Sequence, residues 1–190
     1  MIANASRLVM GGGVIVYPTE TVYGLGASAL DEQAILRVFQ IKRRPHNMPI
    51  SLAVSSMEML QMVAELSIEE LALLDGLFPG PVSVLVRKKN IVPDILTAGS
   101  PMVGIRFPDH EIALRIIERC GPITSTSANK TGSPPPSSVD EVASEIAERV
   151  DLVVDGGKCR YAEPSTLLNL EKREIMRAGA GMDRALKAIS

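Results

Sequence analysis

The chain has 190 residues, with 20 Lys and Arg against 22 Asp and Glu, which gives a formal net charge of −2 at pH 7. Hydrophobic residues make up 46% of the sequence, only 3% of the residues are aromatic, and Trp is absent. This composition supplies apolar side chains for one buried core. It excludes a wholly disordered chain, and it argues against a nucleic-acid binder that depends on global charge or on stacked aromatic rings, which leaves a local basic patch open.

Histidine and cysteine are too scarce for a protein-built zinc centre. His46, His110, Cys120 and Cys159 stand far apart and match neither a CxxC nor an HExxH spacing. Free thiols are typical of a reducing compartment, and the sequence contains neither a signal peptide nor an apolar run of about 20 residues. We therefore expect a cytoplasmic protein with a single domain, residues 1–190, and no C-terminal extension domain.

Apolar periodicity and capping residues predict an alternation of helices and short strands. In chain order they are helix 5–10, strand 13–17, a loop at 18–26, helix 31–44, strand 50–54, helix 57–66, helix 67–77, strands 82–87 and 103–107, helix 112–120, strand 123–125, helix 138–149, and strands 152–155, 166–169 and 174–177, followed by a last helix near residue 184. Strands 82–87 and 103–107 are joined too closely for a helical crossover, so we expect them to be antiparallel. The pattern predicts an α/β fold with an open, twisted, mixed sheet.

Several familiar motifs fail on their context. The GxGxxA match at 24–29 is separated from the preceding strand by Pro18 and polar residues, and the glycine triplet at 11–13 precedes a strand instead of following one. SxxK and KTG matches share the single residue Lys130, although a penicillin-recognising enzyme needs two lysines. Dinucleotide, P-loop and serine-enzyme interpretations are therefore set aside.

Short polar segments remain at strand ends and in loops. Arg106 is the most informative of these positions, because an arginine between Ile105 and Phe107 in an apolar strand needs either exposure or an anionic partner. Lys42 and Arg44 follow a predicted helix, where cations also serve as ordinary end residues.

In their order along the chain, these segments resemble the YrdC/TsaC family of L-threonylcarbamoyladenylate synthases. The matching stretches are YPTETVYGLG at 17–26, KRRP at 42–45, PGPVSVLV at 79–86, VGIRFP at 103–108, TSANKTG at 126–132, DGG at 155–157, PSTLL at 164–168 and RAGA at 177–180. They extend through nearly the whole chain.

The resemblance implies a YrdC-like open sheet with a large basic concave cavity. It implies a nucleotidyltransferase that joins L-threonine, bicarbonate and ATP into threonylcarbamoyl-AMP and pyrophosphate for tRNA threonylcarbamoyladenosine modification. The positions matching the threonine site are Thr21, Arg106, Ser125 and Ser165. The positions matching the ATP site are Lys42, Arg44, Met48, Met102, Ser127, Asn129, Pro135 and Arg177, of which Lys42 and Arg44 are the expected catalytic pair.

Two positions depart from the family pattern. The loop Pro45–Pro49 is one residue shorter than expected, so the match at Met48 could fall on Asn47. Ala53 stands where many relatives carry a histidine, which leaves one threonine contact missing or supplied by His46.

The implied chemistry suits these side chains. Guanidinium groups fork onto carboxylates and phosphates, and transfer at an α-phosphate needs chiefly positive charge and positioning. No residue stands out as a nucleophile, so we expect direct transfer, with Mg²⁺ carried by the ATP.

The expected partners are a downstream threonylcarbamoyl-transferase complex and double-stranded RNA or tRNA. Two alternatives stay open: a non-catalytic RNA-binding module, and a domain that forms a carbamoyl-adenylate. We also expect Arg106→Ala to raise the threonine requirement with little change in melting temperature.

Overall fold

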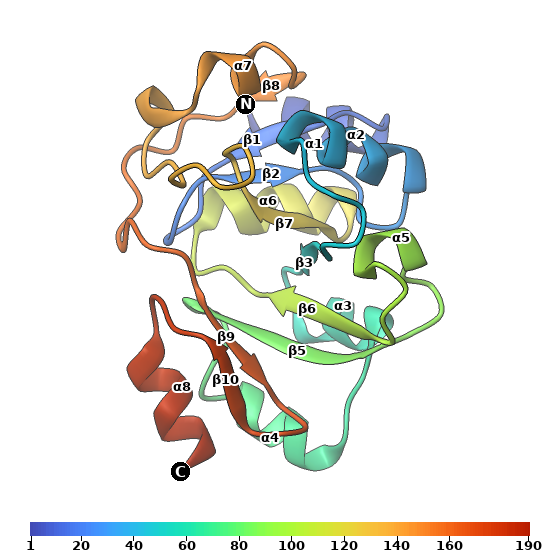
Figure 1. Cartoon of the computed structure of the whole chain (residues 1–190), viewed down its shortest axis with the longest axis vertical. Helices are drawn as coiled ribbons and strands as arrows, with labels where there is room; N and C mark the ends of the chain where they lie inside the picture. Colours follow the sequence, from blue (N-terminus) through green and yellow to red (C-terminus); the bar gives the residue numbers. More distant parts are fainter.

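The computed structural model describes all 190 residues. One sheet extends along the molecule, in the strand order β10-β9-β5-β6-β3-β7-β2-β1-β8, with β4 paired to β5 (Figure 1). The N-terminus lies near one end of the longest axis and the C-terminus at the other. The strands are β1 Ile15–Tyr17, β2 Gly24–Gly26, β3 Ser51–Ala53, β4 Ala64–Glu65, β5 Val82–Lys88, β6 Met102–Arg106, β7 Ile123–Ser127, β8 Leu152–Val153, β9 Thr166–Asn169 and β10 Glu174–Arg177.

Eight α-helices and one 3₁₀ helix accompany the sheet: α1 Ile2–Met10, α2 Glu32–Lys42, α3 Met57–Val63, α4 Ile68–Leu74, α5 Asp94–Thr97, α6 Glu111–Cys120, η1 Val139–Glu141, α7 Ser144–Ala147 and α8 Met182–Ile189. Two predicted helix starts are confirmed. The Asp31 side chain accepts the first free N–H groups of α2, and Ser67 with Glu70 forms a reciprocal capping box on α4. None of the helices combines the length and apolarity needed to span a bilayer.

The sheet is mixed and open, which confirms the predicted fold class. The pairs β1–β8, β3–β6 and β5–β9 are parallel, and the others are antiparallel, including the predicted β5–β6 pair. Alternate residues of the segment that contains β1 enter two separate apolar clusters: Val14 and Val16 join the larger one, and Ile15 and Tyr17 the smaller one. This is the two-residue period of a strand that is covered on both faces.

Three elements were not predicted. Strand β2 lies within the segment expected to be a loop, and β4 and α5 are too short for their periodicity to be recognised. The predicted helix 138–149 is wrong: the segment forms η1 and the single turn α7. The Glu141 carboxylate accepts hydrogen bonds from the Ser137 backbone N–H at 2.6 Å and its hydroxyl at 2.9 Å, so it holds the preceding loop and does not cap a helix at Ser138.

Candidate functional site

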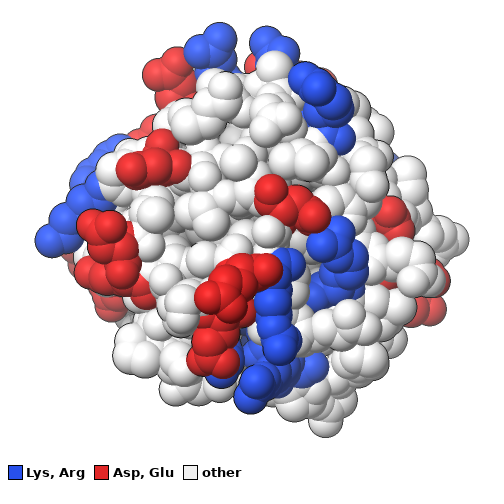
Figure 2. All heavy atoms as spheres, turned by 90° about the horizontal axis from the view of Figure 1, so that it is seen from above, with Lys and Arg blue, Asp and Glu red and all other residues white.

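A cavity of about 480 Å³ opens over the central strands. Three arginines line it, Arg44, Arg106 and Arg177, together with many hydroxyl side chains, and no Asp or Glu is among the lining residues. On the face of the molecule seen in Figure 2, by contrast, acidic and basic side chains lie side by side without a field of one sign. The cavity lining therefore carries only positive charges, although the net charge of the whole chain is −2.

Strand register explains why distant residues meet in this cavity. Ser83 of β5 lies opposite Arg106 of β6, and Ser51 of β3 lies opposite Ser125 of β7. Residues two apart along a strand share a face, and Met102, Gly104 and Arg106 of β6 all belong to the cavity lining.

Gly104 leaves room for the side chain of Ser51, which also lines the cavity. A Cβ atom at this position would lie 2.2 Å from the Ser51 hydroxyl oxygen, a separation that real structures do not contain. Gly24 does the same for Tyr17, because a Cβ there would lie 2.9 Å from the aromatic ring. At both positions a larger residue would force a neighbouring side chain of the cavity lining to shift.

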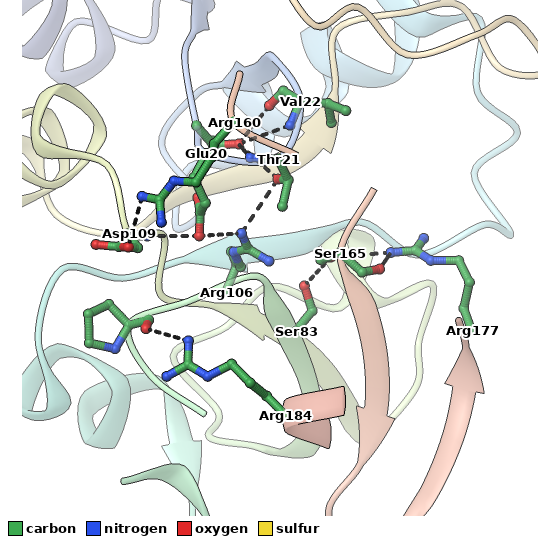
Figure 3. Close-up of polar contacts among 12 residues, drawn as sticks. Glu20, Thr21, Val22, Ser83, Arg106, Asp109, Arg160, Ser165, Arg177 and Arg184 are labelled. Atoms are coloured by element: carbon green, nitrogen blue, oxygen red, sulfur yellow. Dashed lines mark hydrogen bonds and ion pairs between the residues drawn. The ribbon is translucent and has the colours of Figure 1, made fainter. Parts of the chain in front are cut away.

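Arg106 is buried and lies beside one carboxylate. Its Nη2 is 2.7 Å from Glu20 Oε1 and donates a longer hydrogen bond of 3.4 Å to the hydroxyl of Thr21 (Figure 3). The Nε and Nη1 atoms of Arg106 are also buried and have no partner. Burial lowers the pKa of Arg106, and the charge of Glu20 opposes that shift. Unpaired buried donors on a guanidinium are suited to an incoming anion.

Ser165 connects two parts of the cavity wall. Its hydroxyl lies 2.8 Å from that of Ser83, and its carbonyl oxygen accepts a 2.8 Å hydrogen bond from Arg177 Nη2 (Figure 3). Arg177 extends from β10 at the edge of the sheet, so this contact joins the segment before β9 to the last hairpin. Ser83 was not among the predicted site residues, because a serine in an apolar strand carries no signal of its own.

Arg44 and Arg177 place two guanidinium charges at the same cavity. Burial lowers the pKa of Arg44, and the nearby charge of Arg177 lowers it further. Arg44 also donates from Nε to the Met48 carbonyl oxygen at 3.0 Å and from Nη2 to that of Pro49 at 2.8 Å, which fixes the loop after α2. Like charges held close together favour a bound anion.

Lys42 does not line the cavity, although its ammonium contacts Ser127, which does. Its side chain is buried, and its ammonium donates to the carbonyl oxygens of Ser127 and Asn129, the latter at 2.7 Å. Burial lowers the pKa of Lys42 to about 7, with a smaller contribution from the charge of Arg44. Lys42 thus braces the turn that follows β7, and it is not among the residues that line the cavity.

The structure brings eight of the twelve predicted site residues together in the cavity lining: Thr21, Arg44, Met102, Arg106, Ser125, Ser127, Ser165 and Arg177. The other four, Lys42, Met48, Asn129 and Pro135, lie outside that lining. Their direct contact with a nucleotide stays a prediction. Asn129 holds its own loop, since its side-chain nitrogen donates to the Lys130 carbonyl oxygen at 3.0 Å.

The structure places His46 outside the cavity lining, so it does not fill the place of the histidine that Ala53 replaces in the family pattern. Ala53 is fully buried in the smaller apolar cluster, beside Arg106 in the β3–β6 register. His46 is exposed and packs edge-on against Phe39, with ring centroids 5.1 Å apart, outside the cavity lining. Tyr17, which sequence reasoning missed, does line the cavity, and burial raises the pKa of its phenol to about 12.

The open mixed sheet and the arginine-lined cavity define an α/β protein equipped to bind small anionic ligands. A sequence model described as "Telomere recombination", that of the Sua5/YciO/YrdC domain, matches residues 7–179. The chain belongs to this family.

Relatives named as threonylcarbamoyl-AMP synthases match most of the chain. The Pyrococcus abyssi protein of that name is 40% identical over 171 residues, which are 89% of this chain and 50% of that protein. A putative threonylcarbamoyl-AMP synthase from Methanocaldococcus jannaschii is 36% identical over 176 residues, 92% of this chain and 82% of that protein. The chain thus spans about half the length of the P. abyssi relative and most of the other.

Solved structures agree with this placement. The crystal structure of P. abyssi Sua5 complexed with L-threonine superposes with a TM-score of 0.89 at 38% identity, over 94% of this chain and 54% of that one. Escherichia coli YciO gives a TM-score of 0.83 at 28% identity, over 94% of this chain and 88% of that one. Full-length HypF, at 20% identity and a TM-score of 0.82, covers 95% of this chain and 29% of HypF, and it shares the fold alone.

Proposed function

We propose that this chain is an L-threonylcarbamoyladenylate synthase. The nitrogen of L-threonine takes up the carbon of bicarbonate with loss of water, and an oxygen of the resulting carbamate attacks the α-phosphorus of ATP. The bond from that phosphorus to the bridging oxygen breaks, so that threonylcarbamoyl-AMP and pyrophosphate are the products. The observation that carries the proposal is the pair of buried, unpartnered donors on Arg106, which belong to a cavity lined by hydroxyls and two further arginines. Membership of the family, and the similarity to P. abyssi Sua5 complexed with L-threonine, support it.

The threonine half of the site is assigned to the end of the cavity around Arg106. Its Nε and Nη1 atoms are the donors proposed for the carboxylate of threonine. Thr21, Ser125 and Ser165 supply hydroxyls from three different segments of the lining. A site built to hydrogen-bond a substrate hydroxyl rejects apolar analogues, because its own donors would be left unpaired. Threonine is therefore favoured over valine, which has a similar shape.

The nucleotide half is assigned to the wall around Arg44 and Arg177, with Ser127 and Met102 beside it. The two guanidinium groups would stabilise the triphosphate and the charge that develops on pyrophosphate. We propose that Lys42 acts here through the turn it braces, because its ammonium already donates to the Ser127 and Asn129 carbonyl oxygens. Met48, Asn129 and Pro135 are proposed as more distant wall contacts of the nucleotide.

Magnesium is proposed to enter on the nucleotide. The cavity donors are hydroxyl and guanidinium groups, and no cluster of three His, Cys, Asp or Glu side chains is present. Phosphate and water oxygens suit Mg²⁺, which keeps several waters in most protein sites. The residues fit a metal held by ATP, and the protein's part is to hold and orient the phosphates.

The proposed product is an activated acyl group that must be passed on. A mixed anhydride between a carbamate and a phosphate is reactive toward water, so a transferase complex acting on tRNA is the proposed consumer. The finding that supports this role is again the family, whose named relatives are threonylcarbamoyl-AMP synthases. Cytoplasmic location and contact with RNA are proposed on the same ground.

The direct test mixes the protein with Mg-ATP, bicarbonate and L-threonine and follows pyrophosphate, with detection of the AMP adduct by mass. We expect pyrophosphate release only when threonine and bicarbonate are both present. Release that ignores either substrate would contradict the proposal, and so would salt-dependent RNA binding without any turnover. A product made equally well from carbamoyl phosphate without threonine would favour a carbamoyl-adenylate-forming domain.

A matched pair of variants on the last hairpin sharpens this test. Arg177→Ala removes a cavity guanidinium, whereas Lys172→Ala removes an exposed cation from the same hairpin outside the cavity. We expect Arg177→Ala to raise the KM for ATP about tenfold or more, the loss of one charge-assisted contact, and Lys172→Ala to leave it unchanged. Equal effects of the two variants would mean that general surface charge attracts the nucleotide.

A further inference from the structure

Glu20 is a buried carboxylate in a region that the proposed reaction needs to be positive. Its side chain is 1% exposed, and its Oε1 is 2.7 Å from Nη2 of Arg106. Glu20 does not itself line the cavity. It therefore lies behind Arg106, where it contacts the guanidinium without facing the ligand space.

The contact between the two residues is one-sided. Glu20 engages only Nη2 of Arg106, and the Thr21 hydroxyl receives a longer hydrogen bond from the same nitrogen. The Nε and Nη1 atoms are left without partners. A bidentate ion pair would have occupied two nitrogens of the guanidinium, whereas this geometry holds the group by one nitrogen and leaves the other two, both buried, without a hydrogen-bond partner.

Glu20 is held at its Oε1 atom and at its backbone carbonyl oxygen, whereas its Oε2 atom is buried without a hydrogen-bond partner. Its Oε1 accepts a hydrogen bond from the Asp109 backbone N–H at 2.9 Å, and its carbonyl oxygen accepts one from the Tyr161 N–H at 2.9 Å. The Asp109 carboxylate in turn pairs with Arg160 at 3.1 Å, as Figure 3 shows. A group that orients another must be fixed in place, and these contacts supply that.

We propose that Glu20 is the positioning residue of the threonine site: it holds the Arg106 guanidinium by Nη2 so that Nε and Nη1 are presented to the substrate carboxylate. The inference rests on the proposed function, since it assigns the carboxylate of threonine to Arg106. Glu20 acts only through Arg106 and touches no substrate. Two other roles make different predictions. A purely structural carboxylate would affect stability alone, and a carboxylate that acts on the substrate through space would weaken its binding by repulsion.

The kinetic test compares Glu20→Ala and Glu20→Gln with the wild-type protein. Glu20→Ala removes the anchor, and we expect the KM for threonine to rise about tenfold or more, the equivalent of one charge-assisted contact. Glu20→Gln keeps an acceptor oxygen but loses its charge, so we expect an intermediate rise of about threefold, since neutral hydrogen bonds are roughly half as strong. The KM for ATP and the kcat at saturating threonine should change by less than a factor of about two.

Asp151→Asn provides a matched control. Asp151 also accepts a backbone N–H, from Val14 at 2.7 Å, and also pairs with an arginine, Arg37 at 2.9 Å, but it lies outside the cavity lining. This substitution should leave both KM values unchanged. An unchanged or lower threonine KM in the Glu20 variants would overturn the proposal, and so would an equal rise in the KM for ATP.

A second measurement needs no turnover and so separates this inference from the proposed function. In ligand-free protein, the Nε–H group of Arg106 should show an NMR order parameter close to that of rigid backbone, about 0.85, and Glu20→Gln should lower it. Mobility in the wild-type protein equal to that in the variant would overturn the proposal, even if threonine-dependent synthesis is found.

If synthesis is absent but Arg106 is rigid and is released in the variant, the proposed function fails while Glu20 remains the anchor of Arg106. If Glu20→Ala does not fold, Glu20→Gln decides: a threefold rise in threonine KM supports the role, and no rise refutes it.

Discussion

Replacing Arg106 tests both the stability of the buried ion pair and the function of its free donors. In Arg106→Met the Glu20 carboxylate, only 1% exposed, would remain in the interior without its cation. Removing one partner of a buried pair costs about 3 to 5 kcal/mol. For a chain of this size that corresponds to a fall in Tm of roughly 6 to 20 °C. The sequence-based expectation that Tm would hardly change is therefore revised, because it did not include Glu20.

The functional loss arises from the unpartnered donors of Arg106, not from the ion pair. Arg106 offers two unpartnered nitrogens, and hydrogen bonds to charged groups contribute about 1.5 to 3 kcal/mol each. Even one such contact corresponds to a loss of roughly 10- to 150-fold in kcat/KM for threonine, and two to more than about 100-fold. The double variant Glu20→Gln with Arg106→Met removes both charges. Neutral replacement of a buried pair is often close to neutral for stability, so Tm should recover while threonine use stays low.

Calorimetry or thermal melts measure the Tm of each variant. Pyrophosphate release as a function of threonine concentration measures its kcat/KM for threonine. The reasoning would be refuted by a double variant that recovers both Tm and normal threonine kinetics, because Arg106 would then be structural. It would also be refuted by Arg106→Met with unchanged Tm, since the buried Glu20 carboxylate would then have needed no partner.

Three further predictions follow from single contacts. The folded state holds the pKa of Lys42 at about 7, against an ordinary value of 10.5, so the unfolded chain binds an extra proton between these two values. The wild-type protein should therefore gain stability relative to Lys42→Met as the pH rises from 7 to 10. A stability difference that stays constant over this pH range in denaturant titrations would contradict the prediction. Ser83→Ala removes the 2.8 Å partner of the Ser165 hydroxyl, so threonine KM should rise about fivefold, the equivalent of about 1 kcal/mol, with the KM for ATP unchanged in the same assay. Gly104→Ala places a Cβ 2.2 Å from the Ser51 hydroxyl oxygen and should destabilise the fold by about 1 to 3 kcal/mol, measured by chemical denaturation; an unchanged midpoint would show that Ser51 can move aside.

The fold was predictable where a segment carries its own periodicity or cap. Strands β9 and β10 occur at the predicted residues, and Ser67 with Glu70 caps α4 as expected. Strand β2 was missed because Gly24–Gly26 contains two glycines, which are unfavourable in isolated strands. The reason for them is tertiary, since Gly24 and Gly26 leave room for the ring of Tyr17. Close packing between distant segments leaves no local pattern in a sequence.

The site was predictable to a similar extent, and its failures are also tertiary. Arg106 stood out because a charge in an apolar strand requires a partner, but nothing in the sequence identifies that partner as Glu20. Lys42 and Arg44 form one basic cluster in the sequence at the end of α2. The helix ends at Lys42, and Arg43 adopts a left-handed backbone with φ of 50°, so the chain changes direction between the two cations. Lys42 therefore turns into the interior while Arg44 reaches the cavity.

Charge balance over the whole chain and charge at the site are thus separate quantities. A net charge of −2 spread over a surface of mixed sign is screened by salt within about 10 Å, so it has little influence inside a cavity. Within the cavity, Arg44 and Arg177 face the ligand space, and the one carboxylate that contacts a lining arginine, Glu20, lies behind Arg106. The position of that carboxylate determines its effect. In the lining it would repel an anionic substrate, whereas behind Arg106 it fixes the cation and leaves two donors free.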